Sequence, residues 1–253
     1  MDWVAASKAR EMPGLRVVLA KGVWAVWSEC AKSIFYVKKI PYAPVPQISF
    51  EDNADIVAWT GVRNQPQVIY ENEPVRTGWL EILNLAERIA PEPALLPRDS
   101  EQRALVVGLA NELCGESGLG WCKRLQALRP NTASEKTVQI MRTEYGLSEG
   151  DVASTAEQRI ADIVAMLARR LQAQKAAGSR YFVGDRLTAM DIYWTCFSNL
   201  INPLPHELAP MPANIREAFS KPGARVEPVM DPLLFAHRDY IYRTYLKLPL
   251  DFG

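Results

Sequence analysis

The first ninety residues alternate between short β-branched runs and stretches with helical spacing. Leu15–Ala20 predicts a strand that ends before a glycine, and Gln67–Tyr70 predicts a second strand. Between them, apolar residues spaced as on one helix face follow Ser28, which we expect to cap that helix. Three prolines between residues 41 and 46 then favour an extended edge strand. Another helix is expected from Thr77 to the prolines near residue 91, so this region predicts a small α/β domain.

Helical spacing dominates the rest of the chain. The proline-rich segment 90–97 is expected to be a linker, which places an α/β domain at residues 1–92 and an all-helical domain at 98–253. Leucines recur every four residues from Leu105 to Leu113, and a long amphipathic pattern over 160–171 is expected to end near Gly178. The last helix is expected over Leu234–Leu248, with His237 on its apolar face as a core or interface residue. Residues 131–150 predict a loop.

Composition narrows the class of function. The chain has 29 Lys plus Arg and 29 Asp plus Glu, so its formal charge is zero, and it has no basic block suited to nucleic acid. Its four cysteines form no C-x-x-C pair and lie far in sequence from both histidines, so no metal site is expected. No apolar run is long enough for a bilayer, and the first residues are too polar for a signal peptide. We therefore expect a cytoplasmic protein with free thiols and no membrane contact.

The most informative segment is residues 181–194, which reads YFVGDRLTAMDIYW. Thr188 and Asp191 have the spacing of an N-terminal capping box, in which two side chains satisfy the free amides of a helix start. Leu187 and Ile192 occupy the positions of a hydrophobic staple. The helix that follows carries apolar residues on nearly all of its faces, which indicates that it is buried. The first amides of a buried helix cannot rely on water for hydrogen bonds.

This segment resembles the signature of the C-terminal domain of glutathione transferases. Ile40-Pro41-Tyr42 is similar to the tripeptide that follows the first helix in that family, and residues 82–91 resemble its third helix. The resemblance implies a thioredoxin-like domain over 1–92, an all-helical domain over 98–253, and a homodimer. It also implies glutathione as a co-substrate and a small hydrophobic electrophile as the second substrate.

The resemblance places Ser28, directly after Trp27, at the position of the family's catalytic Ser or Cys. A hydroxyl at a helix start can stabilise the thiolate of glutathione, which is the nucleophile. Cys30 has two alternatives, a mixed-disulfide cysteine or a packing residue. Gln65-Pro66 matches the family's cis-proline site, where the main chain of Gln65 would bind the cysteine of glutathione. Arg63 is a candidate contact for a carboxylate.

The sequence departs from the family before the third helix. Arg76-Thr77 stands where an acidic residue and a serine are usual, so the amine of the γ-glutamyl group would lose its partner. Thr77 could still hold the carboxylate at a helix start, and Arg76 could contact it. Either Glu71 or Glu73 could supply the missing acid. A glutathione-dependent transferase, reductase, isomerase or lyase therefore competes with a binding or scaffolding protein that keeps the fold without the chemistry.

Overall fold

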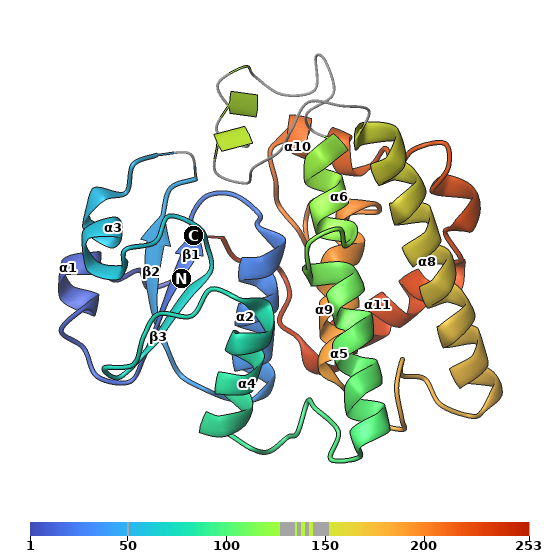
Figure 1. Cartoon of the computed structure of the whole chain (residues 1–253), viewed down its shortest axis with the longest axis horizontal. Coiled ribbons are helices and arrows are strands. Elements are labelled where there is room, and N and C mark those ends of the chain that lie inside the picture. The colour runs from blue at the N-terminus through green and yellow to red at the C-terminus, as the bar shows by residue number, and fades with distance from the viewer. Residues whose placement is uncertain (50, 127–134, 136–137, 140–141, 144–151, 253) are drawn as a thin grey trace. The chain divides into compact units, whose positions relative to one another are not determined.

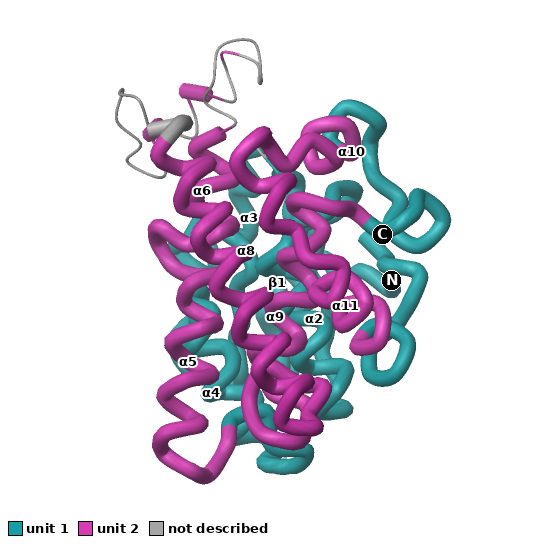
Figure 2. The backbone as a smooth tube through the Cα atoms, turned by 90° about the vertical axis from the view of Figure 1, so that its right-hand side faces the viewer, with its two compact units in different colours: residues 1–96, 204–215, 242–253 teal, residues 97–203, 216–241 magenta. Residues whose placement is uncertain are grey.

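The computed structural model describes residues 1–49, 51–126, 135, 138–139, 142–143 and 152–252. The chain divides into two compact units, shown in two colours in Figure 2. We call Met1–Leu96, Leu204–Ile215 and Tyr242–Gly253 the α/β unit, and Pro97–Pro203 with Arg216–Ile241 the helical unit. Two later segments of the chain thus belong to the α/β unit. The domain ranges 1–92 and 98–253 stay a prediction.

A three-stranded mixed sheet forms the centre of the α/β unit. Strand β1 (Leu15–Ala20) lies between β2 (Ala43–Gln47), which is parallel to it, and β3 (Gln67–Tyr70), which is antiparallel. All three strands lie where the sequence predicts them, and β2 is the expected edge strand. Beyond β3, an isolated bridge joins Val68 to Arg76 and brings one more piece of extended chain to the sheet.

Helices cover both faces of this sheet (Figure 1). Helices α1 (Ala6–Ala9) and α3 (Ala54–Thr60) lie on one face, and α2 (Val26–Val37) and α4 (Trp79–Ile89) pack together on the other. The layer between the sheet and helices α1 and α3 contains a buried cluster, because alternate side chains of a strand point to the same face of the sheet. Its members come from α1, α3 and all three strands: Ala9, Val18, Val45, Ile56 and Ile69.

Two helix starts differ from the sequence prediction. Helix α2 begins at Val26 with Ala25 as its N-cap, so Ser28 is the third residue of the helix and the predicted cap is wrong. Helix α4 begins two residues after Thr77, and its first free amide, on Gly78, donates to Glu81 Oε2 at 3.1 Å. The N-cap residue Ala25 offers no capping side chain to α2, and at α4 the carboxylate of Glu81 accepts from the first amide.

The helical unit contains the predicted long helices. Helix α8 (Val152–Ala176) stops where expected: Gly178 has a φ of 84°, which lets the chain reverse and the Ser179 amide bond the carbonyl of Gln174 at 2.9 Å. Helix α11 (Pro232–Tyr245) runs from this unit into the last segment of the α/β unit. The loop expected at 131–150 falls mostly outside the described residues. The other elements are α5 (Ser100–Cys114), α6 (Leu119–Gln126), α9 (Ala189–Phe197), η1 (Ser198–Leu200), α10 (Ala213–Phe219) and η2 (Glu227–Val229).

The predicted capping box at the start of α9 is confirmed. Asp191 is fully buried, and its Oδ2 accepts from both the amide and the hydroxyl of Thr188 at 2.8 Å. Its Oδ1 accepts from the Phe182 amide at 2.9 Å and lies 3.2 Å from Nε2 of His237. His237 is buried, as expected of a core residue. One carboxylate therefore holds the helix start, the preceding turn and α11 together.

Candidate functional site

Most of the predicted site residues gather at one edge of the sheet, where β1 ends. Ala20 of β1 pairs with Gln47 of β2, and Val18 pairs with Gln67, the first residue of β3. Gln65 and Pro66 directly precede β3, so they reach the same edge. The isolated bridge between Val68 and Arg76 brings the segment that leads into α4 beside the start of β3. We call this place the carboxyl-end edge. Helices α2 and α4 both begin there, and crevices beyond the carboxyl ends of strands are common ligand sites.

Ser28 lies in the first turn of α2 and is buried, with 2% of its surface exposed. Its Oγ accepts from the amide of Ala20, the last residue of β1, at 3.5 Å. A hydroxyl that accepts one bond keeps its O–H as a donor, and the positive end of the helix favours a nearby anion. Because the Ser28 oxygen is the acceptor in the bond from Ala20, its proton can serve a ligand thiolate. Trp27, the preceding residue, is half-buried.

The segment before β3 is fixed by two buried glutamines that the sequence analysis did not single out. Gln47 Nε2 donates to the carbonyl of Arg63 at 2.6 Å. Gln67 Nε2 lies within 3.3 Å of three acceptors, which are Gln47 Oε1 and the carbonyls of Val62 and Asn64. These bonds hold the main chain in place just before Gln65. The sequence signal that could have identified them is a glutamine at a strand position whose side chain is expected to be buried.

The structure also shows the positions of the other predicted site residues of this segment, which are Arg63, Gln65 and Pro66. The Gln65–Pro66 peptide bond is cis, as the resemblance implies. The side chain of Gln65 donates to Ser49 Oγ at 3.1 Å. Arg63 has an exposed side chain, and its main-chain carbonyl accepts the hydrogen bond from Gln47.

Arg76 is held by an acidic neighbour. Its guanidinium donates to Glu73 Oε2 at 2.6 Å, and Arg88 of α4 donates to both oxygens of the same carboxylate at 2.6 and 2.7 Å. Pairing with Arg88 and then Arg76 lowers the pKa of Glu73. Glu73 is thus already shared between two arginines. The other candidate acid, Glu71, bonds the amide of Gly14 next to the start of β1, so the structure does not bring it to the carboxyl-end edge.

A contact that the sequence analysis missed joins the end of the chain to this region. The Gly22 amide, in the loop between β1 and α2, donates to the carbonyl of Phe252 at 2.8 Å. Lys32 Nζ, on α2, donates to the carbonyl of Asp251 at 2.5 Å and to Glu29 Oε1 at 2.6 Å. Burial raises the pKa of Glu29, although the ammonium of Lys32 opposes this shift.

The four cysteines are buried and form no disulfide, and Cys30 lies on the interior side of α2. Burial raises the pKa of Cys122 to about 11 and that of Cys114 well above its usual value, so both are poor thiolates. Among the described residues no three His, Cys, Asp or Glu side chains gather as metal ligands. None of the described helices combines the length and apolar character needed to cross a membrane.

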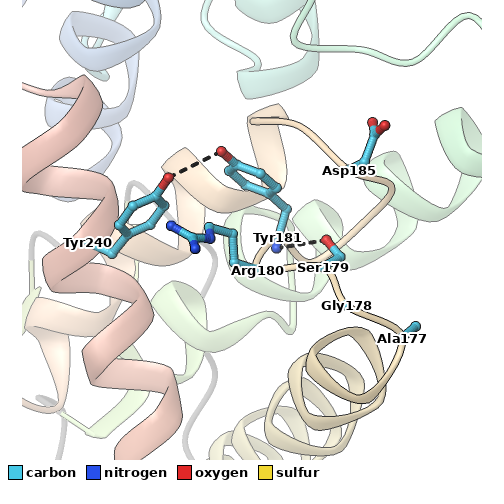
Figure 3. A pocket seen from close by; sticks show the side chains of 7 residues that line it. All are labelled: Ala177, Gly178, Ser179, Arg180, Tyr181, Asp185 and Tyr240. Atoms are coloured by element: carbon cyan, nitrogen blue, oxygen red, sulfur yellow. Dashed lines mark hydrogen bonds between the residues drawn. The ribbon is translucent and has the colours of Figure 1, made fainter.

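The helical unit contains an open cavity of about 400 Å³, and none of the predicted site residues lines it (Figure 3). The hydroxyls of Tyr181 and Tyr240 lie 3.3 Å apart on one side, and the guanidinium of Arg180 lies over the Tyr240 ring at 5.0 Å from its centroid. Ser179 bonds the Tyr181 amide at 3.2 Å and so fixes the turn that follows α8. The remaining lining residues are Ala177, Gly178 and Asp185.

Comparison with known proteins identifies the fold. No protein-family model matches the chain, and no curated protein matches its sequence. Solved structures do match. A glutathione S-transferase from Methylobacillus flagellatus with glutathione bound gives a TM-score of 0.65 at 11% identity, over 90% of this chain and 95% of that one. A glutathione S-transferase domain-containing protein from Marinobacter aquaeolei gives 0.64 at 14%, over 92% and 100%.

Ure2p in complex with glutathione is also similar, with a TM-score of 0.57 at 12% identity over 89% of this chain and 98% of that one. The chain therefore has the glutathione-transferase fold, with a thioredoxin-like unit and a helical unit, as the sequence predicted. Identities at this level establish the fold, and a fold alone does not determine a reaction.

Proposed function

We propose that this protein binds glutathione at the carboxyl-end edge and activates its thiol for attack on a small hydrophobic electrophile. The observation that carries the proposal is the position of Ser28. Its hydroxyl lies in the first turn of α2, against the end of β1, and does not cap the helix. The bound glutathione in one of the similar structures supports the choice of thiol.

In the proposed reaction the Ser28 O–H donates to the sulfur of glutathione and favours the thiolate, which is the reactive form. The sulfur then forms a bond to the electrophilic carbon, and the leaving group departs with the electron pair of its broken bond. Ser28 forms no covalent intermediate. Catalysis would come from stabilising the thiolate and positioning both substrates.

The neighbouring residues would hold the tripeptide. The main chain of Gln65, next to Pro66, would pair with the cysteine of glutathione as an added strand does. Trp27 would cover the thiol, and Arg63 would contact a carboxylate. Thr77 and the amides at the start of α4 would hold the other carboxylate. In this proposal Arg76 keeps its bond to Glu73 and adds positive charge at that end of the ligand.

The second candidate is a glutathione-transferase fold that binds a ligand or partner without catalysis. The arginine at position 76 favours it, because the nearby carboxylate of Glu73 already pairs with Arg76 and Arg88 and is not free for the γ-glutamyl amine. We also propose, from the resemblance alone, that the chain forms a homodimer. Sedimentation at the mass of one chain would contradict that.

Calorimetric titration with reduced glutathione is the first test, followed by turnover with a model aromatic electrophile. We expect reduced glutathione to bind with a Kd between the micromolar and the low-millimolar range. The Ser28→Ala variant should lose at least 10-fold in turnover, because one directed hydrogen bond to a developing charge is worth about 1.5–3 kcal/mol. Ser33→Ala, on the same helix, is the matched control and should keep its turnover. Equal rates for both variants would exclude the catalytic role of Ser28, and no binding at all would favour the second candidate.

A further inference from the structure

The last described residues of the chain contact α2 and the loop that leads into it. Figure 1 shows this red stretch returning from α11 to the sheet. Leu250 is its anchor, since its side chain is buried and its amide donates to the carbonyl of Leu208 at 2.8 Å. Beyond the anchor, the carbonyls of Asp251 and Phe252 accept from Lys32 Nζ and from the Gly22 amide. We call residues Leu250–Phe252 the strap.

The two contacts of the strap flank Ser28. Gly22 lies in the loop that leads from β1 into α2, and Lys32 follows Ser28 by four residues, which places both side chains on the same face of α2. The ring of Phe252 lies under the Lys32 ammonium, 5.5 Å from its centroid. The strap therefore runs from the face of α2 that carries Ser28 to the loop beside the end of β1.

The strap occupies two donors, one before α2 and one on it, that could otherwise serve a ligand beside Ser28. An amide in a loop before a helix start is a donor for a carbonyl or an anion, and here the Phe252 carbonyl takes it. The Lys32 ammonium, on α2, is shared between the Asp251 carbonyl and the carboxylate of Glu29. The strap supplies a main-chain carbonyl to each of these contacts, and the Asp251 side chain also accepts from the amine of Met1 at 3.0 Å. A few polar contacts of this kind can open locally without unfolding the core.

We infer that the strap closes the carboxyl-end edge and that a glutathione-like thiol peptide binds by displacing it from Gly22 and Lys32. This inference rests on the proposed function for its ligand, but the closed strap itself can be measured without one. A site that is covered about 90% of the time has its apparent affinity reduced about 10-fold. The strap thus sets the thiol concentration at which the site fills.

The test compares the full chain with a chain that lacks residues 251–253. This deletion keeps the Leu250 anchor and removes both contacts beside Ser28. Lys247→Gln is the matched control, because it alters an exposed residue just before the strap. Amide exchange at Gly22 is measured by NMR without ligand, and the Kd for reduced glutathione is measured by calorimetry. A fluorine label on the Phe252 ring of the full chain reports whether glutathione releases the strap.

We expect Gly22 to exchange at least 10-fold faster in the shortened chain, and the Kd for glutathione to fall about 10-fold. The fluorine signal of the full chain should narrow as glutathione is added, and the control should match the full chain throughout. Unchanged exchange at Gly22 overturns the strap whether or not glutathione binds. Equal Kd values for the two chains overturn displacement but leave the proposed function standing. No binding to either chain refutes the proposed function and, with it, displacement by a thiol.

Discussion

Removing the carboxylate of Asp191 should destabilise the helical unit severely. In the Asp191→Ala variant three donors lose their acceptor, namely the amides of Phe182 and Thr188 and the hydroxyl of Thr188. Asp191 has no exposed surface, so water cannot replace the carboxylate without opening the unit. Each unsatisfied buried donor costs about 1–3 kcal/mol, and partial relaxation should bring the total to about 4 kcal/mol.

An exposed cap of the same chemistry provides the control. Asp99 caps α5 by accepting from the Gln102 amide at 2.9 Å, and it lies on the surface. Asp99→Ala should cost about 1 kcal/mol, since water can take over the exposed amide. The pair therefore separates the effect of burial from the effect of capping.

The assay is guanidinium unfolding followed by both circular dichroism and tryptophan fluorescence, because a chain with two units can unfold in more than one step. We expect Asp191→Ala to lose about 4 kcal/mol in the free energy of unfolding, and Asp191→Asn to fall between this variant and the wild type. The amide of asparagine keeps one acceptor but turns a donor toward another donor. A loss of under 1.5 kcal/mol for Asp191→Ala, equal to that of Asp99→Ala, would refute the reasoning.

Two further predictions concern ion pairs of the α/β unit. Lys38 has a buried ammonium that donates to Glu87 at 2.6 Å and to the Pro93 carbonyl at 2.8 Å. Lys38→Met should therefore lower the free energy of unfolding by about 2–3 kcal/mol, and a loss below about 0.5 kcal/mol would contradict this. Arg88 and Arg76 lower the pKa of Glu73 in the folded chain. The charged form of Glu73 therefore stabilises the fold at pH values above its unfolded pKa, and this contribution is lost as the pH falls through the lowered, folded-state pKa. Glu73→Gln should therefore melt earlier than wild type at pH 7, and the gap should close on acidification; a gap that is constant with pH would contradict the assignment.

Features that depend on neighbours in sequence were predictable. The helix stop at Gly178 and the capping box at Asp191 need partners within a few residues, and the structure contains both. The three strands pair with distant segments, but each carries its own local signal in β-branched residues or prolines. Helix α3 was not predicted, because it is short and begins after Asn53 in a left-handed conformation with a φ of 45°. Ile56 is its one fully buried residue, so its apolar spacing is weak.

Features that depend on distant partners were not predictable. Ser28 was assigned as a cap from local spacing, but its hydroxyl turns to the end of β1 instead. Arg76 was recognised as a departure, yet its pairing with Glu73 and the bond from Arg88 depend on how α4 packs. The strap contact of Gly22 joins residues that lie more than 200 positions apart, and no periodic pattern signals it.

The prolines of β2 also limit how this sheet can associate. The carbonyl of Gln47 accepts from the Lys21 amide beyond the end of β1, and the carbonyl of Pro44 accepts from Val4 on the outer side. Because successive residues of a strand face opposite neighbours, Pro44 and Pro46 both present their nitrogens outward, where neither can donate. A strand from another molecule would meet carbonyls there without matching N–H groups. The outer side of β2 therefore resists the addition of a further strand, which is the step that seeds sheet-to-sheet aggregation.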